Sequence, residues 1–227
     1  MSNYNKWHES RSKDDDILTP WHLFVKENLQ DQDILDRVIL EIGCGRGGFS
    51  NYLAQRVPSA KKIVAADYSD AAITIAKEKY KSSQIDWRQQ NIMAIDFADN
   101  YFDTIISCET IEHVTDPRKA LIELFRVLKP GGTLFLTCPS YFNLFGVWCL
   151  YRWMIGKPFA EGGQPYVNYI LFPVIYYWLK RIGFKVSSVK SSEITIPARV
   201  PKHFWTSESP YLLRPFGYRT FYILKKD

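Results

Sequence analysis

The chain has 227 residues, of which 46% are hydrophobic and 23% charged, which is typical of one globular domain with a substantial core. Its formal net charge of +5 is mild, and Lys and Arg are scattered rather than gathered in a stripe or arm, so charge gives no argument for a nucleic-acid binder. The longest apolar stretches, 141–155 and 166–179, carry polar interruptions and are shorter than the ~20 residues that cross a bilayer, so we expect no transmembrane helix.

The cysteines and the N-terminus bear on the compartment. Cys44, Cys108, Cys138 and Cys149 form no CxxC pair and have no zinc-ligand spacing. The N-terminus lacks the apolar core of a signal peptide. We therefore expect reduced cysteines and a cytoplasmic protein, with one domain over residues 1–227.

Short β-rich runs alternate with helical patterns, which predicts a parallel sheet flanked by helices. A leading helical segment is expected over 1–35. In chain order, strands are expected over 38–42, 62–66, 85–89, 102–108, 133–138, 185–190 and 218–224. Helices are expected over 48–55, 70–80, 116–128 and 173–182. The aromatic-rich segment 140–167 has no clean period and is expected to form a cap insertion after the fifth strand.

The strongest motif is the glycine run that follows the first expected strand, from Glu41 to Gly48. Closely spaced glycines let the backbone turn tightly and let a ligand approach the main chain. Gly43, Gly45 and Gly48 also satisfy GxGxxG, so a nicotinamide dinucleotide is an alternative ligand. Glu41 can face a cationic amino-acid ligand, and Asp67, which ends the second strand, can accept hydrogen bonds from ribose hydroxyls. Both features favour S-adenosylmethionine.

Further motifs follow in order: Asp67-Tyr68, Asn91-Ile92-Met93, the segment 108–114 and the Lys-Pro-Gly-Gly turn within 128–132. Together with the glycine run they resemble the motifs of class I S-adenosylmethionine-dependent methyltransferases. The resemblance implies an α/β fold, with a Rossmann-like, seven-stranded, mostly parallel sheet whose last strand is antiparallel. It implies S-adenosylmethionine as cofactor, bound by Glu41, Gly43, Cys44, Gly45, Asp67, Tyr68, Asn91, Ile92 and Cys108.

In that resemblance each cofactor residue has a role. The backbone from Gly43 to Gly45 would line the methionine part, Asp67 would bind the ribose, and Tyr68 would pack on the adenine. Asn91 stands where many relatives have Asp, and its carbonyl can still accept a hydrogen bond from the adenine amino group.

Glu109, Glu112 and His113 directly follow the fourth expected strand, at the edge of the sheet where ligands bind. On a helical turn, positions three and four apart share a face, so these side chains are expected to converge. Two carboxylates and an imidazole can bind a divalent cation. The pattern resembles the Glu-x-x-Glu-His of ubiquinone-pathway O-methyltransferases and small-RNA 2′-O-methyltransferases, where it holds a magnesium-type ion that activates the attacked hydroxyl. His113 acting alone as general base and a purely structural turn are the alternatives.

The predicted function is O-methylation of a hydroxyl on a small, hydrophobic or ring-bearing molecule, with His113, Glu112 and Glu109 on the acceptor side. The alternatives are N- or C-methylation, RNA 2′-O-methylation, and a non-catalytic protein that binds the cofactor as a partner subunit. We expect no DNA partner and a monomer or homodimer.

The cap and the remaining histidines add further expectations. The cap's aromatic residues suit an apolar acceptor, peripheral contact with a membrane, or a small core of their own. His8 and His22 lie in the leading segment, which can close over the cofactor or simply pack, and His203 is a candidate fourth ligand or a surface residue.

Overall fold

A computed structural model describes residues 3–10, 19–56, 60–159, 164–192, 205–206 and 216–227. The strands are β1 (Val38–Ile42), β2 (Lys62–Asp67), β3 (Ile85–Gln89), β4 (Phe102–Cys108), β5 (Leu128–Pro139), β6 (Phe184–Ser192), β7 (Trp205–Thr206) and β8 (Arg219–Lys226). The helices are α1 (Asn3–Ser10), α2 (Pro20–Asn28), α3 (Gly48–Arg56), α4 (Asp70–Lys79), α5 (Pro117–Val127), α6 (Leu144–Met154) and α7 (Phe172–Ile182), with 3-10 turns at Asp31–Asp33 and Ile111–His113.

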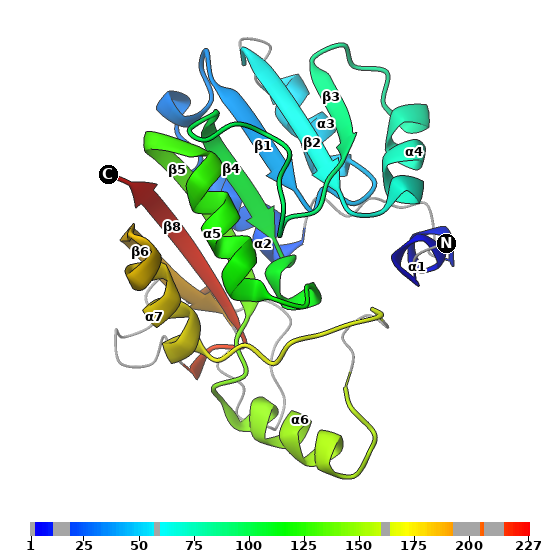
Figure 1. Cartoon of the computed structure of the whole chain (residues 1–227), viewed down its shortest axis with the longest axis vertical. Coiled ribbons are helices and arrows are strands. Elements are labelled where there is room, and N and C mark those ends of the chain that lie inside the picture. The colour runs from blue at the N-terminus through cyan, green and yellow to red at the C-terminus, as the bar shows by residue number, and fades with distance from the viewer. Residues whose placement is uncertain (1–2, 11–18, 57–59, 160–163, 193–204, 207–215) are drawn as a thin grey trace.

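The strands form one sheet in the order β3-β2-β1-β4-β5-β8-β6-β7, flanked by helices (Figure 1). Strands β1 to β5 pair in parallel, whereas β8 pairs antiparallel with both β5 and β6. The predicted Rossmann-like sheet with an antiparallel last strand is thus confirmed. The two-residue strand β7 adds a short edge strand that the sequence did not predict.

Two element starts differ from the sequence prediction, one in its cap and one in its position. Ser69, rather than the expected Asp70, caps α4, because its hydroxyl accepts a hydrogen bond from the Ala72 N–H at 3.2 Å. Strand β5 begins at Leu128 and not at the expected Thr133. Leu128 pairs with Phe102, and Thr133 pairs with Thr104. The register therefore shifts between these two pairs, and the extra residues of β5 include the Pro-Gly-Gly turn.

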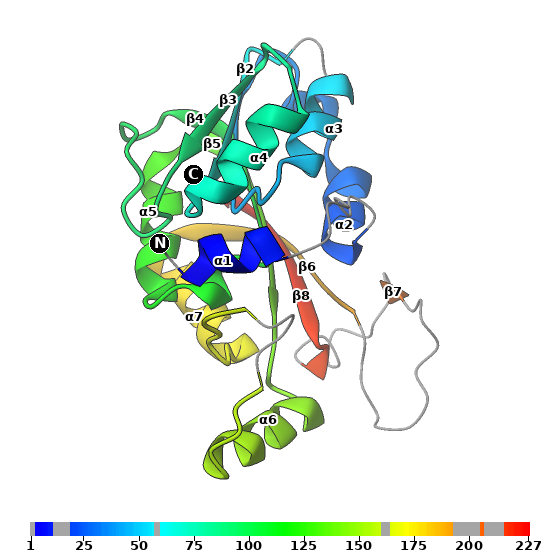
Figure 2. The ribbon, with the colours of Figure 1, turned by 90° about the vertical axis from the view of Figure 1, so that its right-hand side faces the viewer.

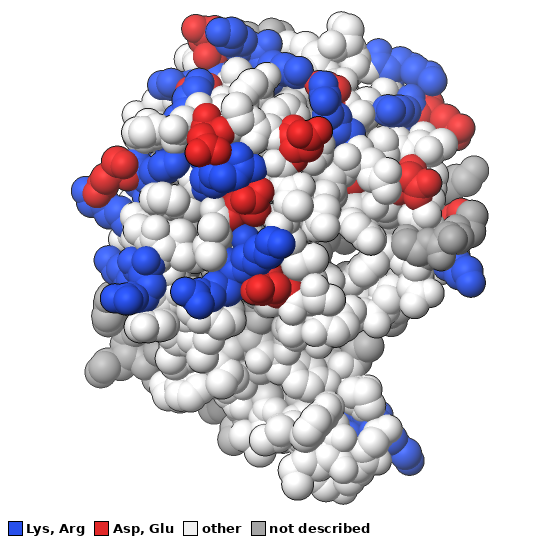
Figure 3. Space-filling model, viewed as in Figure 1, with Lys and Arg blue, Asp and Glu red and all other residues white. Residues whose placement is uncertain are grey.

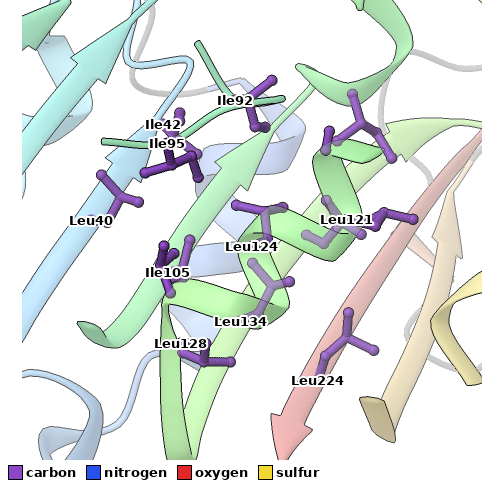
Figure 4. Packing of buried hydrophobic residues seen from close by; sticks show 14 of the residues in the cluster. Leu40, Ile42, Ile92, Ile95, Ile105, Leu121, Leu124, Leu128, Leu134 and Leu224 are labelled. Carbon is purple, nitrogen blue, oxygen red and sulfur yellow. The ribbon is translucent and has the colours of Figure 1, made fainter. Parts of the chain in front are cut away.

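The core lies on both faces of the sheet because side chains alternate along each strand. On one face, α5 packs Leu121 and Leu124 against Leu40, Ile105 and other strand residues (Figure 4). On the other face, α2, α3 and α4 cover a second cluster that includes Ile39, Ile63 and Phe135. Both clusters are buried against the middle of the sheet. This packing holds in place the strand ends that carry the site.

The cap contains a helix, α6, where the sequence showed no clean period. Asn143 caps it by accepting a hydrogen bond from the Gly146 N–H at 2.9 Å. Figures 1 and 2 show α6 projecting away from the sheet. Among the described helices none combines the length and apolar character needed to cross a membrane, and each of the four cysteines is a free thiol.

Candidate active site

A cavity of about 1050 Å³ lies at the carboxyl ends of β1, β2 and β4. Loops that follow these parallel strands form its walls, as ligand sites in open α/β sheets require. The sequence-predicted residues that line it are Gly43, Cys44, Gly45, Asp67, Tyr68, Asn91, Ile92, Cys108, Glu109, Glu112 and His113. The fold therefore brings all the predicted site residues except Glu41 to one cavity.

The glycine loop after β1 closes tightly onto the loop after β4. Gly43 has φ +82°, and a Cβ atom there would lie 2.1 Å from Thr110 Oγ1, so only glycine fits. The Gly45 N–H donates to Asp67 Oδ2 at 2.9 Å, and the Ser69 N–H donates to Asp67 Oδ1 at 2.9 Å. Each carboxylate oxygen has a further lone pair, so Asp67 is held in place and can still accept from ribose hydroxyls.

Glu41 does not line the cavity. Its side chain is buried in β1, where Ser50 Oγ donates to Oε2. Burial raises the pKa of the Glu41 carboxyl to about 8, although the Ser50 hydrogen bond lowers it. Glu41 thus binds Ser50 of α3 and does not line the cavity, which differs from the expected position facing the ligand.

The expected adenine side is formed by the ends of β2 and β3. The Tyr68 ring is half-exposed and meets the Tyr4 ring edge-on at 6.2 Å. Asn91 Oδ1 accepts a hydrogen bond from the Met93 N–H at 2.9 Å, which fixes the orientation of its side-chain amide. Ile92 is buried beside it. An aromatic ring, an apolar side chain and an amide suit a flat heterocycle such as adenine.

His113 is oriented by the segment that returns from the cap. Its Nδ1 lies 2.8 Å from the Tyr166 carbonyl oxygen, which can only accept, so Nδ1 carries the proton in the neutral ring. Nε2 lies 3.6 Å from Glu112 Oε1, and the Glu112 side chain is only 2% exposed. A proton taken up at Nε2 would therefore be stabilised by a nearby carboxylate.

Glu109 departs from the predicted convergence. The helical turn covers only Ile111–His113, and Glu109 precedes it with a left-handed φ of +47°. Its Oε1 accepts from Thr137 Oγ1 at 3.0 Å, and its Oε2 accepts from Arg219 Nε at 3.2 Å. Within the described ranges, no group of three or more His, Cys, Asp or Glu side chains is arranged to hold a metal ion. The predicted Glu109, Glu112 and His113 metal site therefore has no support.

Several cavity residues were missed by sequence reasoning. Arg219 lies at the start of β8, and its guanidinium stacks over the Trp21 ring, 4.9 Å from the centroid. The Tyr4 hydroxyl donates to the His113 carbonyl oxygen at 2.8 Å, and burial, with Glu112 nearby, raises the pKa of Tyr4. Because β8 is antiparallel, its first residue, Arg219, lies at the same edge of the sheet as the ends of β4 and β5. The predicted antiparallel last strand is therefore a signal from which Arg219 could have been placed at the site.

Helix α1 lies across the cofactor side of the cavity. Asn5 hydrogen-bonds to Asp70 and accepts from Ser69 Oγ at 2.8 Å, and Arg46 donates to the His8 carbonyl. His8 and His22 both line the cavity, and the His22 ring stacks on Phe49 at 4.7 Å. Helix α1 and the start of α2 thus lie over the site, while His203 lies outside the described residues.

Comparisons with known proteins agree with this geometry. Residues 40–136 match the methyltransferase domain family. The ubiquinone/menaquinone biosynthesis C-methyltransferase UbiE of Edwardsiella ictaluri is 30% identical over 139 residues, covering 56% of this chain and 55% of that protein. An uncharacterized methyltransferase of Mycobacterium bovis is 32% identical over 120 residues, covering 51% of this chain and 58% of that protein. The chain thus spans about half the length of these curated relatives.

Solved structures show the same fold. A Haloferax volcanii methyltransferase, solved with the Trm112 methyltransferase activator, superposes with a TM-score of 0.70 at 18% identity, covering 100% of this chain and 98% of that one. A Thermotoga maritima S-adenosylmethionine-dependent methyltransferase gives 0.66 at 19% identity, covering 99% and 95%. Residues 40–136 are thus similar to methyltransferase domains, and the chain resembles ubiquinone-pathway methyltransferases in sequence and S-adenosylmethionine-dependent methyltransferases in fold.

Proposed function

We propose that the chain transfers the methyl group of S-adenosylmethionine to a small molecule whose attacked group carries a proton, first of all a hydroxyl. The observation that supports this is one continuous cavity, which joins Gly45 and Asp67 on the cofactor side to Glu112 and His113 on the other. A cofactor on the glycine loop would therefore direct its methyl group toward the acceptor side.

The cofactor supplies an activated methyl on a sulfonium, which is displaced in line. The protein's part is to position the acceptor and to take its proton as the new bond forms. His113 is suited to this because the Tyr166 carbonyl fixes the proton on Nδ1 and leaves Nε2 able to accept one. Glu112, 3.6 Å from Nε2, would balance the resulting positive charge.

Methylation at carbon is the second candidate, and the similarity to UbiE, which is named a C-methyltransferase, favours it. A deprotonated phenol or enol shares its negative charge between oxygen and a ring carbon. The same base therefore serves both reactions, and the orientation of the acceptor decides which atom is methylated. Product analysis by mass spectrometry and NMR with a 13C-labelled methyl group separates the two.

An RNA acceptor has less support from the cavity wall. The basic side chains described there are Arg46 and Arg219, and both make contacts within the protein, to the His8 carbonyl and to Glu109. Three carboxylates, of Asp67, Glu109 and Glu112, line the same wall. A polyanion would meet repulsion there, so we retain a small molecule as the acceptor.

The test combines binding and turnover. We expect adenosylhomocysteine to bind the purified chain, and methylated product to form from a panel of hydroxylated aromatic and enolic acceptors, with or without chelator. His113→Gln should lower kcat about 10²- to 10⁴-fold while leaving adenosylhomocysteine affinity within about twofold. Binding without turnover on any acceptor would instead favour the non-catalytic partner, and absence of binding would refute the proposal.

A further inference from the structure

Helix α6 exposes a stripe of apolar side chains on its outer side. Val147, Leu150, Tyr151 and Met154 recur at helical spacing, so they form one stripe along the helix. Their side chains are 53 to 71% exposed. A surface helix normally turns such a stripe toward the core. A contiguous apolar stripe that faces outward marks an interaction surface.

The opposite side of α6 is held in place, so the stripe is not simply an unpacked face. Phe145 packs its ring against Tyr218 at 5.1 Å and against Phe159 at 5.3 Å, and Cys149 is fully buried. These residues make a small core under the cap. Because this core uses the inner side, the stripe must face outward.

The charged side chains described in the cap are basic. Arg152 lies in α6 and Lys157 follows the helix, whereas the single acidic residue between positions 140 and 170, Glu161, lies outside the described residues. Arg152 Nε donates to the Lys157 carbonyl at 2.9 Å, and the Lys157 side chain is exposed at the end of the helix. In Figure 3 the visible face of the α6 lobe is uncharged except for a small basic area, with no acidic atoms.

We propose that α6 docks on the surface of an anionic lipid bilayer, with the stripe of Val147, Leu150, Tyr151 and Met154 inserted among the lipids and Lys157 facing their head groups. Eleven residues make a helix only about 16 Å long, which can lie in the interface but cannot cross it. Trp153, 61% exposed, and Tyr151 are of the residue types that anchor at membrane interfaces.

The shape of the cap favours lipid over a second copy of the chain. A stable protein interface buries about 800 Å² on each partner, which needs a broad complementary face. Here the apolar residues lie on one short helix that stands out from the body of the molecule (Figure 2). A narrow apolar ridge with basic flanks fits a fluid, negatively charged surface.

The same segment connects the ridge to the cavity. After α6 the chain returns along residues 164–168, where the Tyr166 carbonyl contacts His113 and the Asn168 N–H donates to the Glu112 carbonyl at 2.6 Å. If the proposed methyl transfer holds, on which this step rests, docking of α6 would bring the chain segment that lines the cavity at Tyr166 toward the membrane that dissolves an apolar acceptor.

The test is flotation of the full chain with vesicles of phosphatidylcholine alone and of phosphatidylcholine mixed with phosphatidylglycerol. We expect binding to the anionic vesicles, and the double variant Leu150→Gln/Met154→Gln should weaken it at least about tenfold. The control, Leu35→Gln/Ile122→Gln, changes two other exposed apolar side chains outside α6 and should bind within about twofold of wild type. Lys157→Gln should weaken only the binding to anionic vesicles, about fivefold.

Circular dichroism and adenosylhomocysteine titration confirm that each variant is folded. Absence of vesicle binding, or an equal loss in the control, would overturn the proposal. So would sedimentation that shows a wild-type dimer, a monomeric α6 variant and no vesicle binding, since the stripe would then join two copies. Failure of methyl transfer would leave the vesicle result intact, so the two proposals fail separately.

Discussion

The guanidinium of Arg219, at the start of β8, lies 3.2 Å from the carboxylate of Glu109, in the loop after β4, with both side chains only 11 to 12% exposed. The ion pair links the last strand of the chain to the acceptor side of the cavity. It also uses Glu109 Oε2, while Glu109 Oε1 accepts a hydrogen bond from Thr137.

This pair should be measurably coupled. In a double-mutant cycle with Arg219→Met and Glu109→Gln, we expect a coupling energy of about 1–3 kcal/mol from urea unfolding, because the pair is largely shielded from water. The exposed pair Lys185 and Asp227, at 3.8 Å, is the matched control and should give less than about 0.5 kcal/mol. Equal coupling in both pairs would contradict the expectation.

Asp67 should control cofactor affinity. Both of its carboxylate oxygens accept hydrogen bonds from backbone N–H groups, those of Gly45 and Ser69. In Asp67→Asn the side-chain NH2 group would face one of these N–H groups, and two donors cannot form a hydrogen bond. We expect calorimetry to show adenosylhomocysteine binding weakened about 10- to 100-fold. Asp96→Asn, at an exposed carboxylate, should change nothing measurable.

Gly43 and Gly131 separate backbone strain from steric overlap. Both have positive φ, +82° and +77°, but a Cβ at Gly131 meets nothing within 4 Å, whereas one at Gly43 overlaps Thr110. Gly131→Ala should cost about 1–2 kcal/mol of unfolding free energy, and Gly43→Ala a further 1–3 kcal/mol or so. Thr110→Ala removes the two nearest overlapping atoms and should restore part of the loss; similar costs at both glycines would argue against the overlap.

Glu41 should make stability fall as pH rises. Its folded pKa of about 8 exceeds the ordinary value of 4.5, so the folded state holds more protons between these values. The stabilisation is complete below about pH 4.5 and is lost as pH rises toward about 8. Glu41→Gln should remove this dependence, and the variant should gain on the order of a few kcal/mol relative to wild type across that window. Urea unfolding at several pH values measures this dependence. As a control, Glu78→Gln at an exposed position should show the same pH dependence of stability as wild type.

The sheet was largely predictable, because its strands are short apolar runs that end at polar residues or glycine. Strands β1, β3 and β4 have the bounds that the sequence predicts. The glycine loop and Asp67 could be placed as well, since both follow directly from strand ends at one edge of a parallel sheet.

The acceptor side was harder to predict because it depends on backbone conformation and distant pairing. Helical spacing brought Glu109 together with Glu112 and His113, but the left-handed φ of Glu109 turns its carboxylate toward Thr137 and Arg219. The Tyr166 contact with His113 joins residues 53 positions apart. No local pattern in the sequence encodes these contacts.

The position of β8 has a consequence for how the protein is made. Residues Arg219–Lys226 pair with β5 on one side and with β6 on the other, so these two strands, which come earlier from the ribosome, cannot join until β8 has emerged. A nascent chain would therefore expose one edge of β5 and one of β6 until β8 has been synthesised. Unfinished sheets aggregate through such open edges, so we expect the chain to depend on chaperones most strongly in the interval between the emergence of β6 and that of β8.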